Sequence, residues 1–219
     1  MFRPSCAVEW LFCLVLLLLP LYAPAQQPSV LLPVDEAALR PAFFAFRARL
    51  QQAIARRDAR TILDAVDPDV RTSFGDGGGL DDFHRQWRPD TPDSPLWSTL
   101  GTVLALGGSF ADDGSFRAPY VFSRWPDDMD AFEHMAVVAE SVRVRERPGL
   151  DAPVVGSVSF GIVRVEAPED REAPWRAVRL ADGRRGFMAT QYLRSPVDYR
   201  AIFSETAGGW RLTAFIAGD

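Results

Sequence analysis

The residues best spaced for chemistry surround a run of glycines in the first half of the chain. Asp76, Asp82 and His84 lie in or just after the segment Gly75–Gly79, which reads GDGGG. Two carboxylates can hold calcium or transfer protons, and a histidine can act as a general acid or base. The spacing lacks the ligand pattern and the closing glutamate of an EF-hand loop. The three residues are candidates for a pocket, although acids in the first turn of a helix, with a histidine at the edge of its apolar face, would give the same pattern.

Most other catalytic chemistries lack their residues in this sequence. The two cysteines, Cys6 and Cys13, both fall in the first 25 residues, and the chain contains no lysine. The two histidines, His84 and His134, lie fifty residues apart, whereas zinc enzymes use closely spaced ligands. No G-x-S-x-G, G-x-G-x-x-G or P-loop motif occurs. We expect no catalytic centre, no metal and no cofactor.

The N-terminal residues have the pattern of a secretory signal peptide. Arg3 precedes the apolar run Trp10–Leu19, which is shorter than the roughly 20 residues that cross a bilayer. Residues 23–25 (APA) then supply the small side chains of a cleavage site. We expect residues 1–25 to be removed together with both cysteines, and the mature chain to be periplasmic or secreted, without a membrane span. The net charge of −5 argues against nucleic acid as a partner.

From Val137 to about residue 194 the apolar residues alternate in short segments separated by turn residues, which is the pattern of a small all-β unit. Six pieces of this region, in order, resemble the bacterial SH3 (SH3b) domain family: Val142–Pro148 (VRVRERP), Ala152–Gly156 (APVVG), Gly161, Trp175–Val178 (WRAV), Asp182–Phe187 (DGRRGF) and Tyr192–Leu193. The resemblance implies a small all-β SH3-like barrel over residues 135–195.

The same resemblance implies binding rather than catalysis, with peptidoglycan or an envelope protein as the partner. Trp175, Phe187 and Tyr192 are the candidate ligand-binding residues, because aromatic rings can stack on a ligand and two of these three carry a polar group. Phe187 stands where the family usually has tryptophan. The alternative is that all three rings belong to the core or rim of the barrel.

Before this region the periodicity is helical. Apolar residues recur at spacings of three and four in residues 40–65, with Asp58 at the start of a second helix, and again after Leu80 and after Leu96. Strands are predicted at residues 70–74, 109–111 and 116–122. Residues 26–134 are therefore predicted to form an N-terminal α+β domain, and the whole chain to be α+β.

The two ends of the mature chain resemble nuclear transport factor 2-like α+β domains, in the helical segment 49–70 and in the closing WRLTAF at 210–215. The resemblance implies a sheet that curls around a helix to form a conical pocket, which both enzymes and binding proteins use. It carries no functional residue over to this chain.

Two alternating segments, 198–204 and 210–216, follow the predicted barrel and are joined by a glycine turn. An isolated hairpin is marginally stable, so it must pack on something. It can complete the first domain as residues 196–219, which makes the barrel an insertion, or it can dock on the barrel. We expect the first arrangement, because the first domain has few strands to cover its helices.

Taken together, the residues predict a non-enzymatic binding protein of the cell envelope. One alternative is an enzyme or small-ligand binder that uses a conical pocket in the first domain. The other is a structural adaptor.

Overall fold

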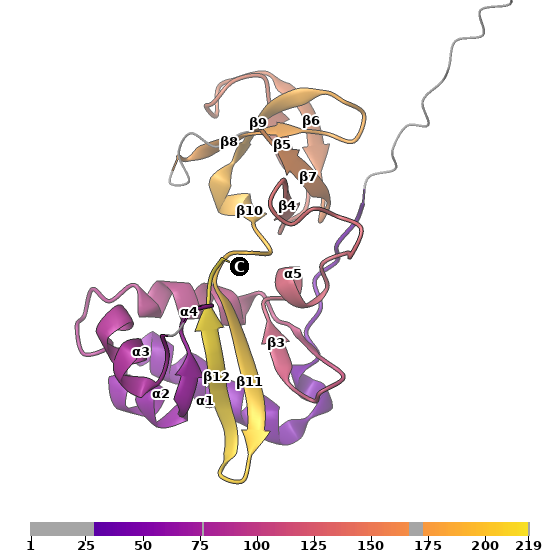
Figure 1. Cartoon of the computed structure of the whole chain (residues 1–219). Coiled ribbons are helices and arrows are strands. Elements are labelled where there is room, and N and C mark those ends of the chain that lie inside the picture. Colours follow the sequence, from indigo (N-terminus) through magenta and orange to yellow (C-terminus); the bar gives the residue numbers. More distant parts are fainter. Residues whose placement is uncertain (1–28, 76, 167–172, 219) are drawn as a thin grey trace, which may run out of the picture.

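A computed structural model describes residues 29–75, 77–166 and 173–218. The expected signal peptide and the candidate Asp76 lie outside these residues. The described chain combines helices with two sheets, so its fold class is α+β. In this part of the chain no helix is both long and apolar enough to cross a membrane. Figure 1 shows the two sheets one above the other, with most of the helices around the lower sheet.

The lower sheet has five strands in the order β1-β12-β11-β3-β2. β12 is parallel to β1, and the other neighbours are antiparallel. The strands are β1 (Val66–Arg71), β2 (Ser109–Phe110), β3 (Phe116–Ala118), β11 (Arg200–Thr206) and β12 (Gly209–Ile216). The C-terminal hairpin, β11 and β12, therefore lies inside the five-stranded sheet with the strands of the first domain, and it is not docked on the upper sheet.

Two of the helices around this sheet begin at residues that favour a helix start. Pro41 takes the first turn of α1, and the Asp58 side chain accepts a hydrogen bond from the Thr61 N–H at 3.1 Å to cap α2. The helices are η1 (Ala37–Leu39), α1 (Pro41–Arg56), α2 (Ala59–Ala65), α3 (Leu80–Trp87), α4 (Leu96–Ala105) and α5 (Tyr120–Ser123).

Aromatic rings form the core between α1 and the five-stranded sheet. The Phe43 ring on α1 lies 4.3 Å from that of Phe116, 4.8 Å from that of Trp210 and 5.6 Å from that of Phe203, measured between centroids. Phe203 and Trp210 belong to the C-terminal hairpin. The hairpin therefore buries its aromatic side chains on the first part of the chain.

Two strands differ from the predicted ones. β1 spans Val66–Arg71 instead of 70–74, and it contains Pro68. The proline is tolerated because β1 is an edge strand with a single neighbour, so a missing N–H breaks no second ladder. β3 ends at Ala118 instead of 122, because Pro119 precedes a short helix, α5.

The upper sheet has seven strands in the order β10-β4-β7-β8-β9-β5-β6. Among the described residues, the buried members of its core cluster are valines, leucines and a methionine. β10 and β6 are edges, so strand pairing among the described residues does not close this sheet into a barrel. Its elements are β4 (His134–Val137), β5 (Val142–Arg145), β6 (Val154–Val158), β7 (Ile162–Val165), β8 (Trp175–Arg179), β9 (Arg185–Ala189), η2 (Thr190–Tyr192) and β10 (Leu193–Arg194).

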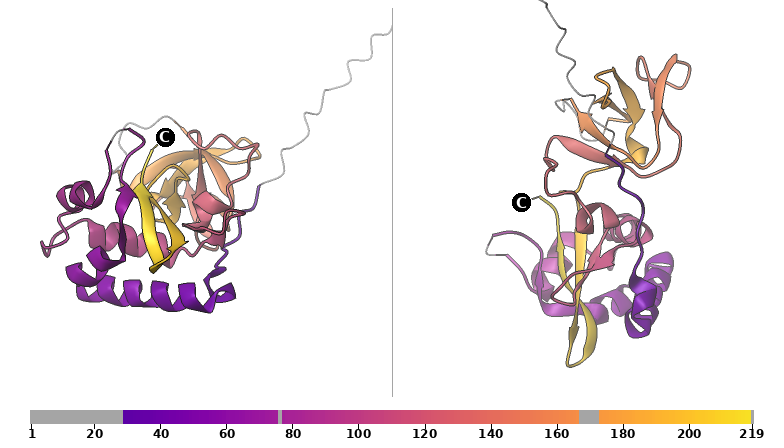
Figure 2. Two further views of the ribbon diagram at one scale, coloured as in Figure 1. Left: turned by 60° about the horizontal axis from the view of Figure 1, so that its bottom comes forward. Right: turned by 90° about the vertical axis from the view of Figure 1, so that its right-hand side faces the viewer.

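A leader segment, residues 29–35, joins the two sheets. The Leu31 N–H donates to the Phe160 carbonyl at 2.7 Å, and Asp35 forms a parallel bridge with Gly108. The right-hand view of Figure 2 shows this indigo segment running from the upper sheet to the lower helices. Leu31 is buried with Tyr120 and Ile162, which belong to different parts of the fold. The leader therefore contributes to a small apolar cluster at the junction.

Candidate functional site

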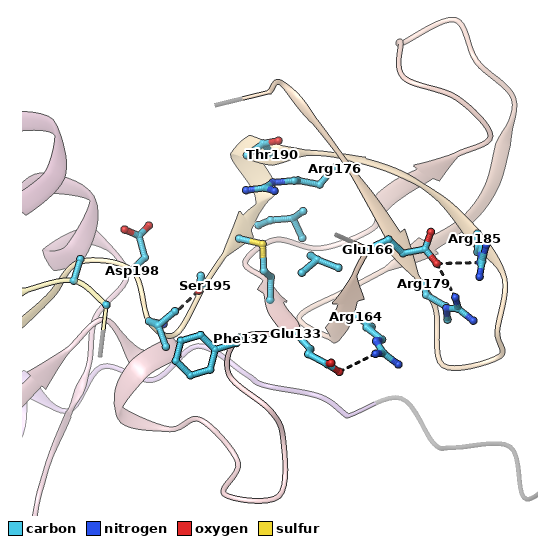
Figure 3. A pocket seen from close by; sticks show the side chains of 16 residues that line it. Phe132, Glu133, Arg164, Glu166, Arg176, Arg179, Arg185, Thr190, Ser195 and Asp198 are labelled. Carbon is cyan, nitrogen blue, oxygen red and sulfur yellow. Dashed lines mark hydrogen bonds and ion pairs between the residues drawn. The ribbon is translucent and has the colours of Figure 1, made fainter. Parts of the chain in front are cut away.

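A cavity lies on the upper sheet, where that sheet meets the two ends of the C-terminal hairpin (Figure 3). Its volume is about 860 Å³, which is within the range of small-ligand sites. β4, β7, β8 and β9 supply much of the wall, and residues 195–198 and 217–218 supply another part. Because the segments that flank the C-terminal hairpin contribute to the wall, the cavity depends on how the hairpin is joined to the upper sheet.

Part of the cavity wall is apolar and continuous with the core of the upper sheet. Met135, Val165 and Leu193 line the cavity and also pack in the aliphatic core. A ligand that lies against these side chains removes apolar surface from water, which favours binding.

Charged side chains surround this apolar area, and most of them form ion pairs. Glu166 Oε1 lies 2.7 Å from Arg179 Nη2 and 2.9 Å from Arg185 Nε. On another side, Arg164 Nη2 lies 2.9 Å from Glu133 Oε2. Glu166 therefore pairs with two arginines, and Glu133 pairs with one.

A further pair lies at the edge nearest the C-terminal hairpin. Asp198 lines the cavity, and its Oδ2 lies 2.7 Å from Arg194 Nη1. Burial lowers the pKa of the Arg194 guanidinium, and the charge of Asp198 opposes that shift. The carboxylate of Asp198 is therefore already paired with an arginine of the protein.

Arg176 is the arginine of the cavity wall for which the described residues provide no ion pair. Its Nε is buried and has no hydrogen-bond partner in the described part of the chain. Figure 3 shows its side chain beside Thr190, apart from the group around Glu166. Arg176 lies opposite Met188 in the β8–β9 ladder and two residues before the buried Val178, so strand alternation directs it to the core side of the sheet.

The sequence contains one local signal for Arg176. In the segment WRAVR, Arg176 and Val178 are two residues apart and share one face of the strand, so a charged residue stands where the alternating pattern expects an apolar one. The other charged residues of the cavity come from five segments, and only the fold brings them together. Sequence periodicity cannot show that arrangement.

The predicted aromatic residues lie elsewhere on the upper sheet. Trp175 and Phe187 lie opposite Ala189 and Ala177 in the β8–β9 ladder, on the face away from the buried Met188. Tyr192 lies in η2, with 38 % of its surface exposed. Trp175 and Phe187 thus share one face, and no ring contact among the described residues joins either of them to Tyr192.

The candidates near the glycine turn make local contacts. Asp82 accepts a hydrogen bond from the Gly78 N–H at 2.7 Å and pairs with Arg85, in the first turns of α3. His84 Nε2 lies 2.5 Å from Asp90 Oδ2, with about half of the His84 side chain exposed. These contacts join the glycine loop to α3 and α3 to the loop that follows it. Between 29 and 218, gaps excepted, no group of three His, Cys, Asp or Glu side chains is placed to hold a metal.

A second cavity, of about 530 Å³, lies between α1, α2 and the tip of the C-terminal hairpin. Arg49, Asp64, Glu205 and Arg211 are among its wall residues. Asp82 and His84 line neither this cavity nor the larger one.

Comparison with known proteins gives no relative: the sequence matches no family model and no curated protein. Both family resemblances therefore depend on the quoted residues alone.

Proposed function

We propose that this chain is a non-enzymatic binding protein of the cell envelope, with the upper sheet as an SH3-like binding module. The pieces of the SH3b pattern fall on its regular elements. Val142–Arg145 is β5, and Val154 to Gly156 lies in β6. Gly183 has φ +85°, as a glycine turn between β8 and β9 requires. This correspondence supports the resemblance.

The observation that carries the proposal is the different use of aromatic residues in the two sheets. In the lower part of the molecule, aromatic rings pack against one another inside the core. In the upper sheet the core is aliphatic, and Trp175 and Phe187 lie on the opposite face, half-buried. Large rings outside a core are the residues that most often dominate a binding surface. We propose peptidoglycan as the ligand of this face, with an envelope protein as the alternative partner.

Sedimentation with purified peptidoglycan tests the proposal. We expect the mature protein to sediment with the cell wall, and the double variant Trp175→Ala/Phe187→Ala to lose most of that retention. Leu150→Ala is the control, because Leu150 is 80 % exposed on a loop of the same sheet and should have no effect. Tyr192→Ala, tested alone, shows whether the third candidate contributes. A wild-type protein that stays in the supernatant would exclude peptidoglycan, and equal retention of the double variant would exclude this face.

The proposed location has its own test. If the chain is exported, mass spectrometry of the secreted or periplasmic protein should find Gln26 as the first residue. A protein that keeps residues 1–25 would contradict the proposed location.

A further inference from the structure

The cavity on the upper sheet has more positive than negative charge, although the chain as a whole has a net charge of −5. Four arginines and three carboxylates line it: Arg164, Arg176, Arg179, Arg185, Glu133, Glu166 and Asp198. Asp198 is neutralised by Arg194, which lies beside the cavity wall, and Glu133 is neutralised by Arg164. Glu166 then balances only one of Arg179 and Arg185, and Arg176 remains without a carboxylate among the described residues.

Arg176 is placed to bind an anion. Its guanidinium group is held on the core side of β8, and its Nε is buried without a hydrogen-bond partner in the residues described. Arg179 and Arg194 also have a buried Nε, but both form ion pairs, whereas Arg176 has no carboxylate partner in the described part of the chain. A ligand carboxylate that pairs with Arg176 therefore offsets the cost of holding this charge partly buried. A carboxylate matches the planar fork of a guanidinium and can accept two parallel hydrogen bonds from it.

The surroundings restrict the charge of that ligand. The other unbalanced positive charge belongs to the group around Glu166, and Figure 3 shows Arg176 apart from that group. A ligand group at Arg176 therefore meets a single guanidinium, and a carboxylate can reach it while the existing ion pairs stay in place. This single charge matches a monoanion better than a doubly charged group such as a phosphate monoester.

The apolar part of the wall defines the rest of the ligand. Met135, Val165 and Leu193 offer a surface on which aliphatic groups can pack, and a volume of about 860 Å³ accommodates a short peptide. We infer that this cavity binds a carboxylate attached to an apolar body, with the carboxylate on Arg176 and the body against Met135, Val165 and Leu193. Such a group occurs at the C-terminus of a short apolar peptide and in a fatty acid. The inferred site lacks Trp175 and Phe187, so it is independent of the surface proposed above.

Calorimetric titration of the mature chain tests this site with three probes. The first is N-acetyl-alanyl-leucine with a free carboxylate, the second is the same peptide as its C-terminal amide, and the third is octanoate. We expect at least one of the two carboxylates to bind, and the amide to bind at least about tenfold more weakly than the free peptide if the natural ligand is a peptide. Binding of octanoate alone would assign the site to a fatty acid. The absence of binding by both carboxylates, or equal binding of peptide and amide, would overturn the inference.

Matched variants then locate the site. Arg176→Gln should weaken carboxylate binding at least about tenfold, whereas Arg143→Gln, the same charge change at an exposed position of β5, should leave it unchanged. If Arg176→Gln does not fold, NMR titration of the wild-type chain replaces it: the amide signals of Val165, Thr190 and Leu193 should shift with the carboxylate probe. Full affinity in Arg176→Gln, or shifts confined to other residues, would contradict the assignment. Peptidoglycan sedimentation of Arg176→Gln should remain at the wild-type level, because the two surfaces are separate.

Discussion

At the scale of single residues, a two-point ion pair joins the leader to α1. Arg47 is 6 % exposed, and two of its nitrogens each lie 2.7 Å from a carboxylate oxygen of Asp35. Burial would raise the pKa of Asp35, but the hydrogen bonds from Arg47 and from the Ala37 N–H outweigh it, and the pKa is lowered. The ionised form of Asp35 is therefore the one that the fold stabilises.

This contact gives a prediction for stability. Asp35→Asn should lower the free energy of unfolding by about 1–3 kcal/mol, because it leaves the buried Arg47 charge without its partner. Asp64→Asn is the control, because Asp64 and Arg60 form an exposed pair at 4.0 Å and should contribute less than about 0.5 kcal/mol. Urea denaturation at neutral pH measures both values. Equal effects of the two variants would show that the Asp35–Arg47 pair does not stabilise the junction of leader and helix.

At the scale of elements, the C-terminal hairpin links the end of the chain to its beginning. Trp210 on β12 is 7 % exposed and packs against Phe43 on α1. Trp210→Ala should lower the free energy of unfolding by about 3–5 kcal/mol, since it opens a cavity in the aromatic core.

The matched control is Phe132→Ala, because Phe132 is 63 % exposed and its removal should change stability by less than about 0.5 kcal/mol. Thermal unfolding followed by circular dichroism separates the two cases. A Trp210→Ala variant as stable as Phe132→Ala would mean that the hairpin is not part of the core of the lower sheet.

Elements with local signals could be predicted from the sequence. Helical periodicity and capping residues place α1, α2 and α4 close to where the structure has them. The aromatic residues of the two end segments indicate that the hairpin must be buried. The small number of strands in the first domain indicates that it is buried there.

Other features depend on contacts between distant segments, and local patterns do not contain them. Pro68 lies within a strand because β1 has a neighbour on one side only, and the order of strands is not visible from the residues themselves. The cavity around Arg176 is not visible in the sequence for the same reason: its charged residues come from separated strands and from the segments next to β4, β7 and β10. Trp175 and Phe187 lie on one face of β8 and β9, two strands that a short turn joins, and their role as ligand-binding residues stays a prediction.

At the scale of the whole molecule, three segments of the chain run between the upper and lower sheets. The leader at residues 29–35 is one, and the segments before β4 and after β10 are the others (Figure 1). The leader also adds an antiparallel bridge between Val30 and Gly161 on the upper side. Three connections and a shared apolar cluster restrict motion between the sheets more than a single linker does.

Neighbouring leucines of the leader test whether it fastens the two sheets. Leu31 is 6 % exposed and belongs to the junction cluster with Tyr120 and Ile162, whereas Leu32 is 61 % exposed. Leu31→Ala should therefore lower the free energy of unfolding by about 2–4 kcal/mol, and Leu32→Ala by less than about 0.5 kcal/mol. Both variants remove the same atoms one residue apart, so differences in helix or strand propensity cancel.

The same pair of variants distinguishes a fastened junction from a loose one by calorimetry. If the junction couples the sheets, the wild-type chain should unfold in one transition, and Leu31→Ala should separate it into two, because each sheet has its own apolar core. Leu32→Ala should keep the single transition. Two transitions already present in the wild type, or equal behaviour of the two variants, would show that the sheets are stable independently of the leader.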